Sequence, residues 1–134
     1  MRLWHKDLID VLPDNQLKGQ WRECCLIAKA LHDGNLNHLL VNKVKKYLLS
    51  EFAGYCLNVY LECERRGLVR NADRAMQYFD GICEPEFIGW HNDRYLLQCY
   101  YNLQEKYDCG GISEKEWKRV ENRVSQLLGG DTQC

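Results

Sequence analysis

The stretch from residue 14 to residue 31 repeats apolar side chains at intervals of three and four residues, and this pattern constrains the fold most. The repeating residues are Leu17, Trp21, Cys24, Ala28 and Leu31. This spacing places all of them on one face of an α-helix. Asp14 follows Pro13 and is a suitable N-cap, and the segment "HDGN" at 32–35 ends the pattern. Because the apolar face must be buried, the rest of the chain has to cover this helix.

Residues 36–67 predict two further helical segments. The stretch "LNHLLVNKVKKYLL" at 36–49 mixes apolar and basic side chains, which is typical of a short helix or helical turn with an exposed lysine cluster. The lysines of this cluster are Lys43, Lys45 and Lys46. Ser50 is a candidate N-cap for a long helix with a wide apolar face. Basic residues in its last turn and Gly67 in the left-handed conformation are expected to end it.

The remaining sequence predicts two more long helices. One runs over about residues 92–107 and repeats apolar residues at helical spacing. Ser113 followed by Glu116 is a capping box, which opens a last helix over about residues 114–128. Strand signals are weak along the whole chain.

These segments predict an all-α fold. We expect a single compact domain of three or four main helices over residues 1–128, which suits a chain of 134 residues. A Gly-Gly pair is expected to begin a flexible C-terminal tail at 129–134. No apolar run approaches the ~18 residues that cross a membrane, and the N-terminus lacks a signal-peptide segment. We therefore expect a cytoplasmic monomer without a membrane partner.

Cysteine spacing and charge narrow the function classes. The eight cysteines form no C-x-x-C pair and no zinc-finger spacing, so we expect reduced thiols and no metal or other cofactor, with disulfides and a metal site as lesser alternatives. Cys56 and Cys63 are seven residues apart, which predicts small core residues on one helix face. The net charge of −1 is unlike that of a generic polyanion binder. Residues 1–74 nevertheless hold 12 Lys and Arg against 9 Asp and Glu, so they can form a local basic face.

The segment "QLKGQWRECC" at 16–25 places a carboxylate at the border of the buried helix face. Gln16, Gly19, Gln20 and Glu23 are three or four residues apart and share one face. A mid-helix glycine costs ~1 kcal/mol relative to alanine, which is tolerable where something approaches the backbone closely. We interpret this face as a small notch with Glu23 at its edge. An ordinary surface carboxylate beside a surface arginine is the simpler interpretation.

The N-terminus offers a chemical use for this carboxylate, because the first residues lead directly into the same helix. An α-amine has a pKa of ~7.8 against ~10.4 for lysine, so a larger share of it is unprotonated at neutral pH. Such an amine is a good nucleophile toward a sugar C1′, with which it forms a Schiff base. A nearby carboxylate can then transfer protons or stabilise the cationic intermediate. The candidate catalytic residues are therefore Met1 and Glu23.

Several segments match motifs of one known family. Its first-helix pattern D-Q-x-L-x-x-[EQ]-[YW]-R-E is matched loosely by Asp14, Gln16, Leu17, Gln20, Trp21, Arg22 and Glu23. "ECERRGL" at 62–68 is similar to the close of its middle helix, and the stretch at 87–107 is similar to its late "YIPHEA…RLDEKI" region. The chain thus resembles the pyrimidine-dimer DNA glycosylase family of endonuclease V-like enzymes. The opening "MRLWHKDLI" is similar to a bacterial and phage subgroup of that family.

The resemblance implies a DNA repair glycosylase with AP-lyase activity on damaged pyrimidines. It implies that the fold kinks double-stranded DNA containing a damaged or abasic nucleotide and flips a base. It further implies that an N-terminal α-amine attacks C1′, that Glu23 is the acid/base and that Arg22 helps to hold the DNA. Here Arg2 follows Met1 directly, and a bulky second residue protects the initiator methionine from removal. The amine of Met1 is therefore the expected nucleophile.

Candidate DNA-binding residues lie between residues 2 and 46. They are Arg2, Arg22, His38, Lys43, Lys45 and Lys46. An ordinary solvated face is the simpler interpretation of the lysines. Two other functions stay open: a non-catalytic helical module of the same fold that binds DNA or a protein, and a lyase of related chemistry acting on another sugar-like or nucleotide substrate.

Overall fold

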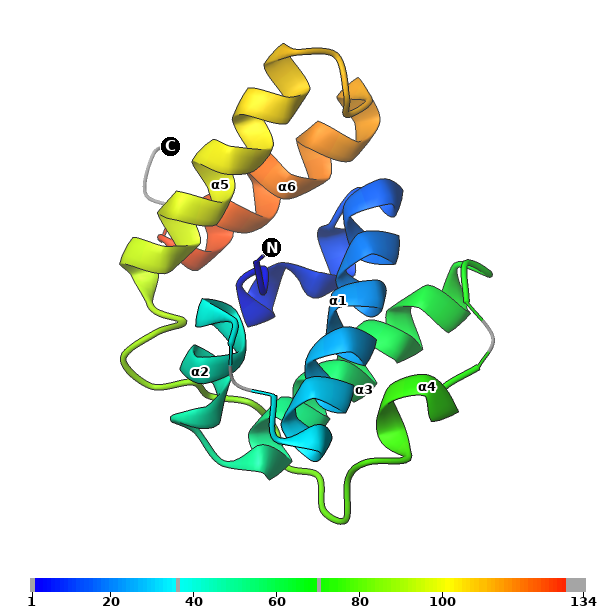
Figure 1. The fold of residues 1–134 in the computed structure, drawn as a ribbon. Coiled ribbons are helices and arrows are strands. Elements are labelled where there is room, and N and C mark those ends of the chain that lie inside the picture. Colours follow the sequence, from blue (N-terminus) through cyan, green and yellow to red (C-terminus); the bar gives the residue numbers. More distant parts are fainter. Residues whose placement is uncertain (1, 36, 70, 130–134) are drawn as a thin grey trace.

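The computed structural model describes residues 2–35, 37–69 and 71–129, and within these ranges it consists of helices and loops without a strand (Figure 1). The long helices are α1 (Asp14–Asp33), α3 (Leu49–Arg65), α5 (Asp93–Asp108) and α6 (Glu114–Leu127). The short ones are the 3₁₀-helix η1 (Lys6–Val11), α2 (Leu39–Lys45) and the single turn α4 (Asp73–Met76). The predicted all-α class is confirmed, with more short helices than the sequence indicated. None of the described helices is long and apolar enough to cross a membrane.

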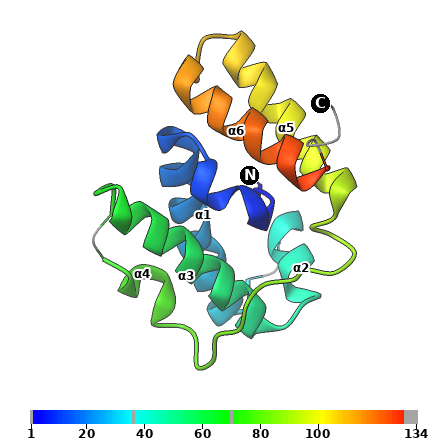
Figure 2. The same ribbon diagram turned by 180° about the vertical axis from the view of Figure 1, so that it is seen from behind.

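The N-terminal segment and η1 occupy the middle of the molecule, between two pairs of helices (Figures 1 and 2). On one side α1 packs against α3, and on the other α5 pairs with α6. The short helix η1 contacts both α3 and α6, so it joins the two pairs. The first residues of the chain are therefore enclosed by elements from distant parts of the sequence.

The N-terminal segment belongs to the hydrophobic core. Leu3, Leu8 and Leu12 have no exposed surface, and they share one cluster with Phe52 and Leu103. Burying a leucine side chain contributes ~1.5–3 kcal/mol. Three such side chains fix this short stretch to the helices around it.

Two arginines fasten η1 to its neighbours. Arg66, at the end of α3, donates to the carbonyl oxygens of Asp10 at 3.0 Å and Leu12 at 2.7 Å. Arg123 of α6 donates to the Asp7 carbonyl oxygen at 2.8 Å and pairs with the Asp10 carboxylate through both terminal nitrogens. This guanidinium holds the pKa of Asp10 below its usual value.

The start of α1 differs from the prediction. Asp14 is the first helical residue, and Pro13 occupies the N-cap position without a side-chain hydrogen bond. The Asp14 carboxylate pairs instead with Arg66 at 2.9 Å. Its N–H donates to Glu116 Oε2 of α6 at 2.9 Å, so a distant helix supplies the missing cap.

The two other predicted caps have different outcomes. Ser50 lies one residue inside α3, whose N-cap is Leu48, and the Ser50 carbonyl accepts the N–H of Cys83 at 3.0 Å. At the start of α6 both hydrogen bonds of the Ser113–Glu116 capping box are present, which confirms that prediction.

Most cysteines of the described residues are buried free thiols. They are Cys24, Cys25, Cys56, Cys63 and Cys99. The prediction that Cys56 and Cys63 are small core residues is confirmed, since neither has exposed surface. Burial raises the pKa of Cys63 to about 11, which keeps this thiol protonated at neutral pH.

His91 ties the start of η1 to the loop before α5. Its Nδ1 accepts the backbone N–H of Lys6 at 2.9 Å. The ring is buried against the aromatic rings of Phe87, Trp90 and Tyr95. Burial lowers the pKa of His91 to about 2, so the imidazole is neutral in the folded protein.

We expect the protein to lose stability as the pH falls below ~6.5. Unfolded histidine takes up a proton below its ordinary pKa of ~6.5, whereas folded His91 does so only near pH 2. The unfolded state therefore binds more protons in this window, and the free energy of unfolding falls by up to ~1.4 kcal/mol per pH unit for this group. Urea denaturation at about pH 7.5 and about pH 5 measures the change.

The variant His91→Gln tests this prediction directly. It should weaken the pH dependence of the free energy of unfolding between about pH 6.5 and 5. An undiminished dependence in His91→Gln would contradict the prediction.

Candidate functional site

A surface depression of about 390 Å³ brings together the N-terminal segment, α1 and α5. Its lining residues are Arg2, Trp4, Gln16, Gly19, Gln20, Glu23, Asn102 and Lys106. The α1 members are the residues whose spacing predicted one shared face. Two predicted site residues, Arg2 and Glu23, are thus brought to one place although they are far apart in the sequence.

The Glu23 carboxylate is half-buried on α1. Its Oε2 atom is shielded from solvent, yet it accepts no hydrogen bond from any described residue. Gln16 is another lining residue, and its buried Oε1 atom also accepts no hydrogen bond from a described residue. The ion pairs of the described residues include none between Glu23 and Arg22. Buried acceptors normally have a partner, so two unbonded ones in one depression indicate room for a donor.

The side chain of Arg2 contacts Trp4 and lies near α5. Its guanidinium carbon lies 5.4 Å from the centroid of the Trp4 ring, which is a cation–π contact. Burial raises the pKa values of Tyr95 and Cys99 on α5, and the positive charge of Arg2 beside them opposes this effect. The cation is therefore fixed at one side of the depression.

Gln20 holds the N-terminal backbone against α1. The side chain is 1% exposed, its Oε1 accepts the N–H of Trp4 at 2.6 Å, and its Nε2 donates to the carbonyl oxygen of Arg2 at 2.9 Å. The hydroxyl of Tyr55 lies 2.8 Å from the same Oε1 and 2.6 Å from the Trp4 carbonyl oxygen. Gln20 thus gives residues 2–4 the kind of partner that a neighbouring strand would provide.

The α5 side of the depression consists of Asn102 and Lys106. These residues are four apart and lie on one face of the helix. The sequence patterns did not single them out, although they fall within the stretch at 87–107 that resembles the family. Their helical spacing was the only signal, and it does not tell which face of α5 meets the N-terminal segment.

Three other predicted DNA-binding residues do not line the depression. Arg22 is exposed on α1. His38 is the N-cap of α2, where its Nδ1 accepts the N–H of Leu40 at 3.2 Å. Lys43 is half-buried, with its Nζ 5.6 Å from the centroid of the Trp90 ring.

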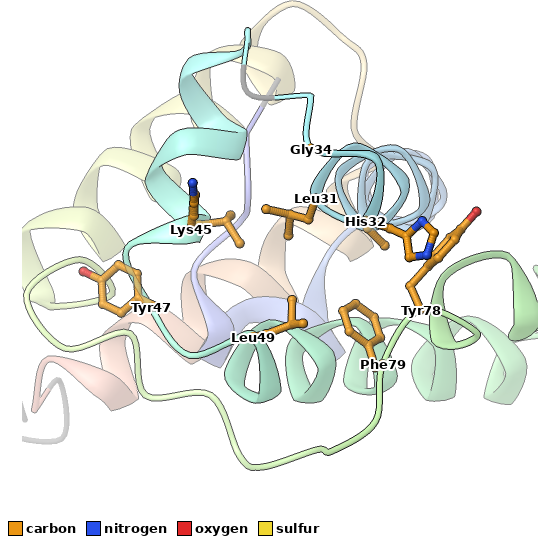
Figure 3. A pocket seen from close by; sticks show the side chains of 10 residues that line it. Leu31, His32, Gly34, Lys45, Tyr47, Leu49, Tyr78 and Phe79 are labelled. Carbon is orange, nitrogen blue, oxygen red and sulfur yellow. The ribbon is translucent and has the colours of Figure 1, made fainter.

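The two remaining lysines also lie elsewhere. Lys45 borders a second cavity of about 320 Å³ near the C-terminal end of α1, and Lys46 is exposed. The walls of this cavity are mainly apolar, and Leu31, Leu49 and Phe79 point into it (Figure 3). The predicted lysine cluster is therefore separate from the depression around Glu23.

Met1, the predicted nucleophile, lies outside the described residues. Its neighbour Arg2 is described and lines the depression. Among the described residues no group of three or more His, Cys, Asp or Glu side chains is placed to hold a metal ion.

The fold and the depression define a helical protein that places a carboxylate and two cations beside its N-terminal residues. A family model described as pyrimidine dimer DNA glycosylase matches residues 1–76, which is more than half of the chain. The chain therefore belongs to the pyrimidine dimer DNA glycosylase family, and the predicted resemblance is confirmed. No curated protein and no solved structure matches the chain significantly.

Two mid-helix glycines have opposite surroundings. A Cβ atom on Gly19 of α1 would meet no described heavy atom within 4 Å. A Cβ atom on Gly54 of α3 would lie 1.9 Å from the carbonyl oxygen of Cys83. The depression is therefore open in front of Gly19, whereas the backbone of a loop closes the space in front of Gly54.

Alanine substitutions at these glycines should have opposite effects on stability. Gly19→Ala should raise the free energy of unfolding by ~1 kcal/mol, because alanine favours the helix and meets no obstacle. Gly54→Ala should lower it by ~1–3 kcal/mol or more, because the Cys83 carbonyl has to move. Urea denaturation of both variants measures the difference, and a destabilised Gly19→Ala protein would show that the space is filled.

Proposed function

We propose that this protein is a DNA repair glycosylase with AP-lyase activity, which acts on damaged pyrimidines through a Schiff base at the α-amine of Met1. One observation carries the proposal: the Oε2 atom of Glu23 is buried without a donor among the described residues, in a depression that Arg2 also lines. Membership of the pyrimidine dimer DNA glycosylase family supports the substrate class. The protein is proposed to act as a monomer and without a cofactor.

The covalent chain ties the proposed nucleophile to the depression. Consecutive Cα atoms are ~3.8 Å apart, so the α-amine of Met1 cannot be far from Arg2. An amine beside Arg2 supplies the kind of donor that the Oε2 atom of Glu23 lacks among the described residues. In that arrangement the carboxylate can accept a proton from the attacking amine.

The first chemical step exchanges the glycosidic bond for a bond to the protein. The lone pair of the unprotonated amine bonds to C1′, and the bond from C1′ to the base nitrogen breaks. The base leaves with the electron pair and takes up a proton. The sugar ring then opens as O4′ is protonated, which leaves an iminium ion at C1′. Glu23 accepts the amine proton and passes it to O4′ as the ring opens, so it is again a carboxylate that stabilises the positive charge.

The second step breaks the DNA strand by β-elimination. The iminium ion makes the hydrogens on C2′ acidic, and Glu23 as a base removes one of them. The electron pair forms a double bond between C2′ and C3′, and the phosphate on C3′ leaves with its oxygen. Water then hydrolyses the imine and restores the free amine.

Local charge favours DNA although the net charge of the chain is −1. Arg2 and Lys106 place two cations in the depression against the single carboxylate of Glu23. Phosphate contacts supply much of the affinity of proteins for DNA. We assign these two cations and the exposed Arg22 to the phosphates around the damaged nucleotide. His38 and the lysine cluster are assigned to the duplex further along.

Borohydride should trap a covalent adduct at Met1 when the protein acts on duplex DNA with an abasic site. The reductant converts the imine into a stable amine, and peptide mapping locates the bond. Intact mass first has to show an N-terminus without a formyl or acetyl group, because a blocked amine cannot form an imine. A free N-terminus without any adduct would exclude the proposed chemistry. DNA binding that does not respond to salt would then favour a protein-binding module.

Glu23→Gln should slow strand cleavage by ~100-fold or more, because a general acid/base typically contributes at least that factor to the rate. The dissociation constant for abasic duplex DNA should change by less than about threefold, because the amide has the same shape and removes a negative charge. Single-turnover cleavage and fluorescence anisotropy measure the two quantities. Glu121→Gln is the control, since Glu121 is equally half-buried but lies on α6. If Glu23→Gln cleaved at the wild-type rate, Glu23 would have no role in the mechanism.

A further inference from the structure

We infer that Tyr95, Tyr55 and Gln20 are positioning residues, which fix the backbone of residues 2–4 and thereby set where the α-amine of Met1 lies. The inference rests on the proposed function, since it concerns the reach of the same nucleophile. None of the three side chains needs to touch the substrate. Each acts through the N-terminal backbone.

Every residue from 2 to 4 has a backbone polar group bound by one of these side chains. Gln20 donates to the carbonyl oxygen of Arg2 and accepts the N–H of Trp4. The hydroxyl of Tyr95 donates to the carbonyl oxygen of Leu3. The hydroxyl of Tyr55 lies 2.6 Å from the carbonyl oxygen of Trp4.

The three side chains come from three different helices. Gln20 lies on α1, Tyr55 on α3 and Tyr95 on α5. Residues 2–5 have no regular secondary structure, so neither a helix nor a sheet fixes their backbone. Hydrogen bonds from three directions therefore restrict both the position and the rotation of this segment.

Burial makes these hydrogen bonds hard to exchange for water. Gln20 is 1% exposed and Tyr55 has no exposed surface. A buried hydrogen bond adds little net stability compared with apolar packing. It forms, however, only when its partners are in one arrangement. A core of leucine side chains alone would leave the buried N–H and C=O groups of the segment without partners and would fix its rotation less strictly.

The reaction needs this restriction because the amine lies one residue beyond the fixed segment. A reacting atom displaced by 1 Å can cost ~100-fold in rate, while the binding of substrate is unaffected. Loss of a positioning residue should therefore appear in the rate of the chemical step and not in the affinity for DNA.

Tyrosine-to-phenylalanine variants test the inference, because each removes one hydroxyl and keeps the ring. Tyr95→Phe should trap abasic DNA with borohydride ~10- to 100-fold more slowly at saturating DNA. Its dissociation constant for DNA should stay within about threefold of the wild-type value. Tyr55→Phe is the second variant and should show the same split between rate and affinity.

Tyr47→Phe is the matched control. Its hydroxyl also donates to a backbone carbonyl, that of Ile88 at 3.0 Å, and the residue is half-buried like Tyr95. It does not line the depression around Glu23. The control should lose a similar amount of thermal stability and keep the wild-type trapping rate.

The outcomes separate the inference from the proposed function. Wild-type protein with a free N-terminus and no adduct overturns both. Wild-type trapping with equally fast trapping by Tyr95→Phe and Tyr55→Phe overturns the positioning role alone. Slow trapping that scales with thermal stability in all three variants, Tyr47→Phe included, also overturns it, because the loss is then one of folding.

Discussion

The hydrogen bonds of the Gln20 side chain are the interaction on which the rest of the structure depends. A stretch without regular secondary structure crosses the middle of a helical protein, and each of its buried N–H and C=O groups needs a partner. Gln20 supplies two of these partners, and the hydroxyls of Tyr55 and Tyr95 bind two of the carbonyl oxygens. His91 accepts the N–H of Lys6. The helices can enclose the segment only because these side chains replace the solvent that it loses.

This arrangement couples the fold to the candidate site. Arg66 at the end of α3 and Arg123 of α6 both bind η1, so the two helix pairs are joined through the N-terminal stretch. The same stretch places Arg2 in the depression with Glu23. Residues 2–12 cannot shift without disturbing the core leucines among them. Under the proposed mechanism this arrangement fixes the residues next to the nucleophile, and it ties activity to global stability.

The sequence predicted the features that depend on local spacing. The four long helices follow from apolar periodicity, and the face shared by Gly19 and Glu23 follows from helical geometry. Features that depend on distant contacts were not predictable. Asp14 does not cap its own helix because Arg66 and Glu116 bind it from α3 and α6. Lys106 joins the depression through the packing of α5 beside the N-terminal segment, which no local pattern encodes.

The depression combines residues inside the family match with residues beyond it. Residues 1–76 match the family model and contain Arg2, Gly19 and Glu23, whereas Asn102 and Lys106 lie beyond the match. The second half of the chain is acidic, yet it contributes a cation at the one place where it borders the depression. At physiological ionic strength charges more than ~8 Å away are largely screened. A phosphate in the depression would therefore respond mainly to nearby charges, which include those of Arg2, Lys106 and Glu23. Net charge is a poor guide to what such a chain can bind.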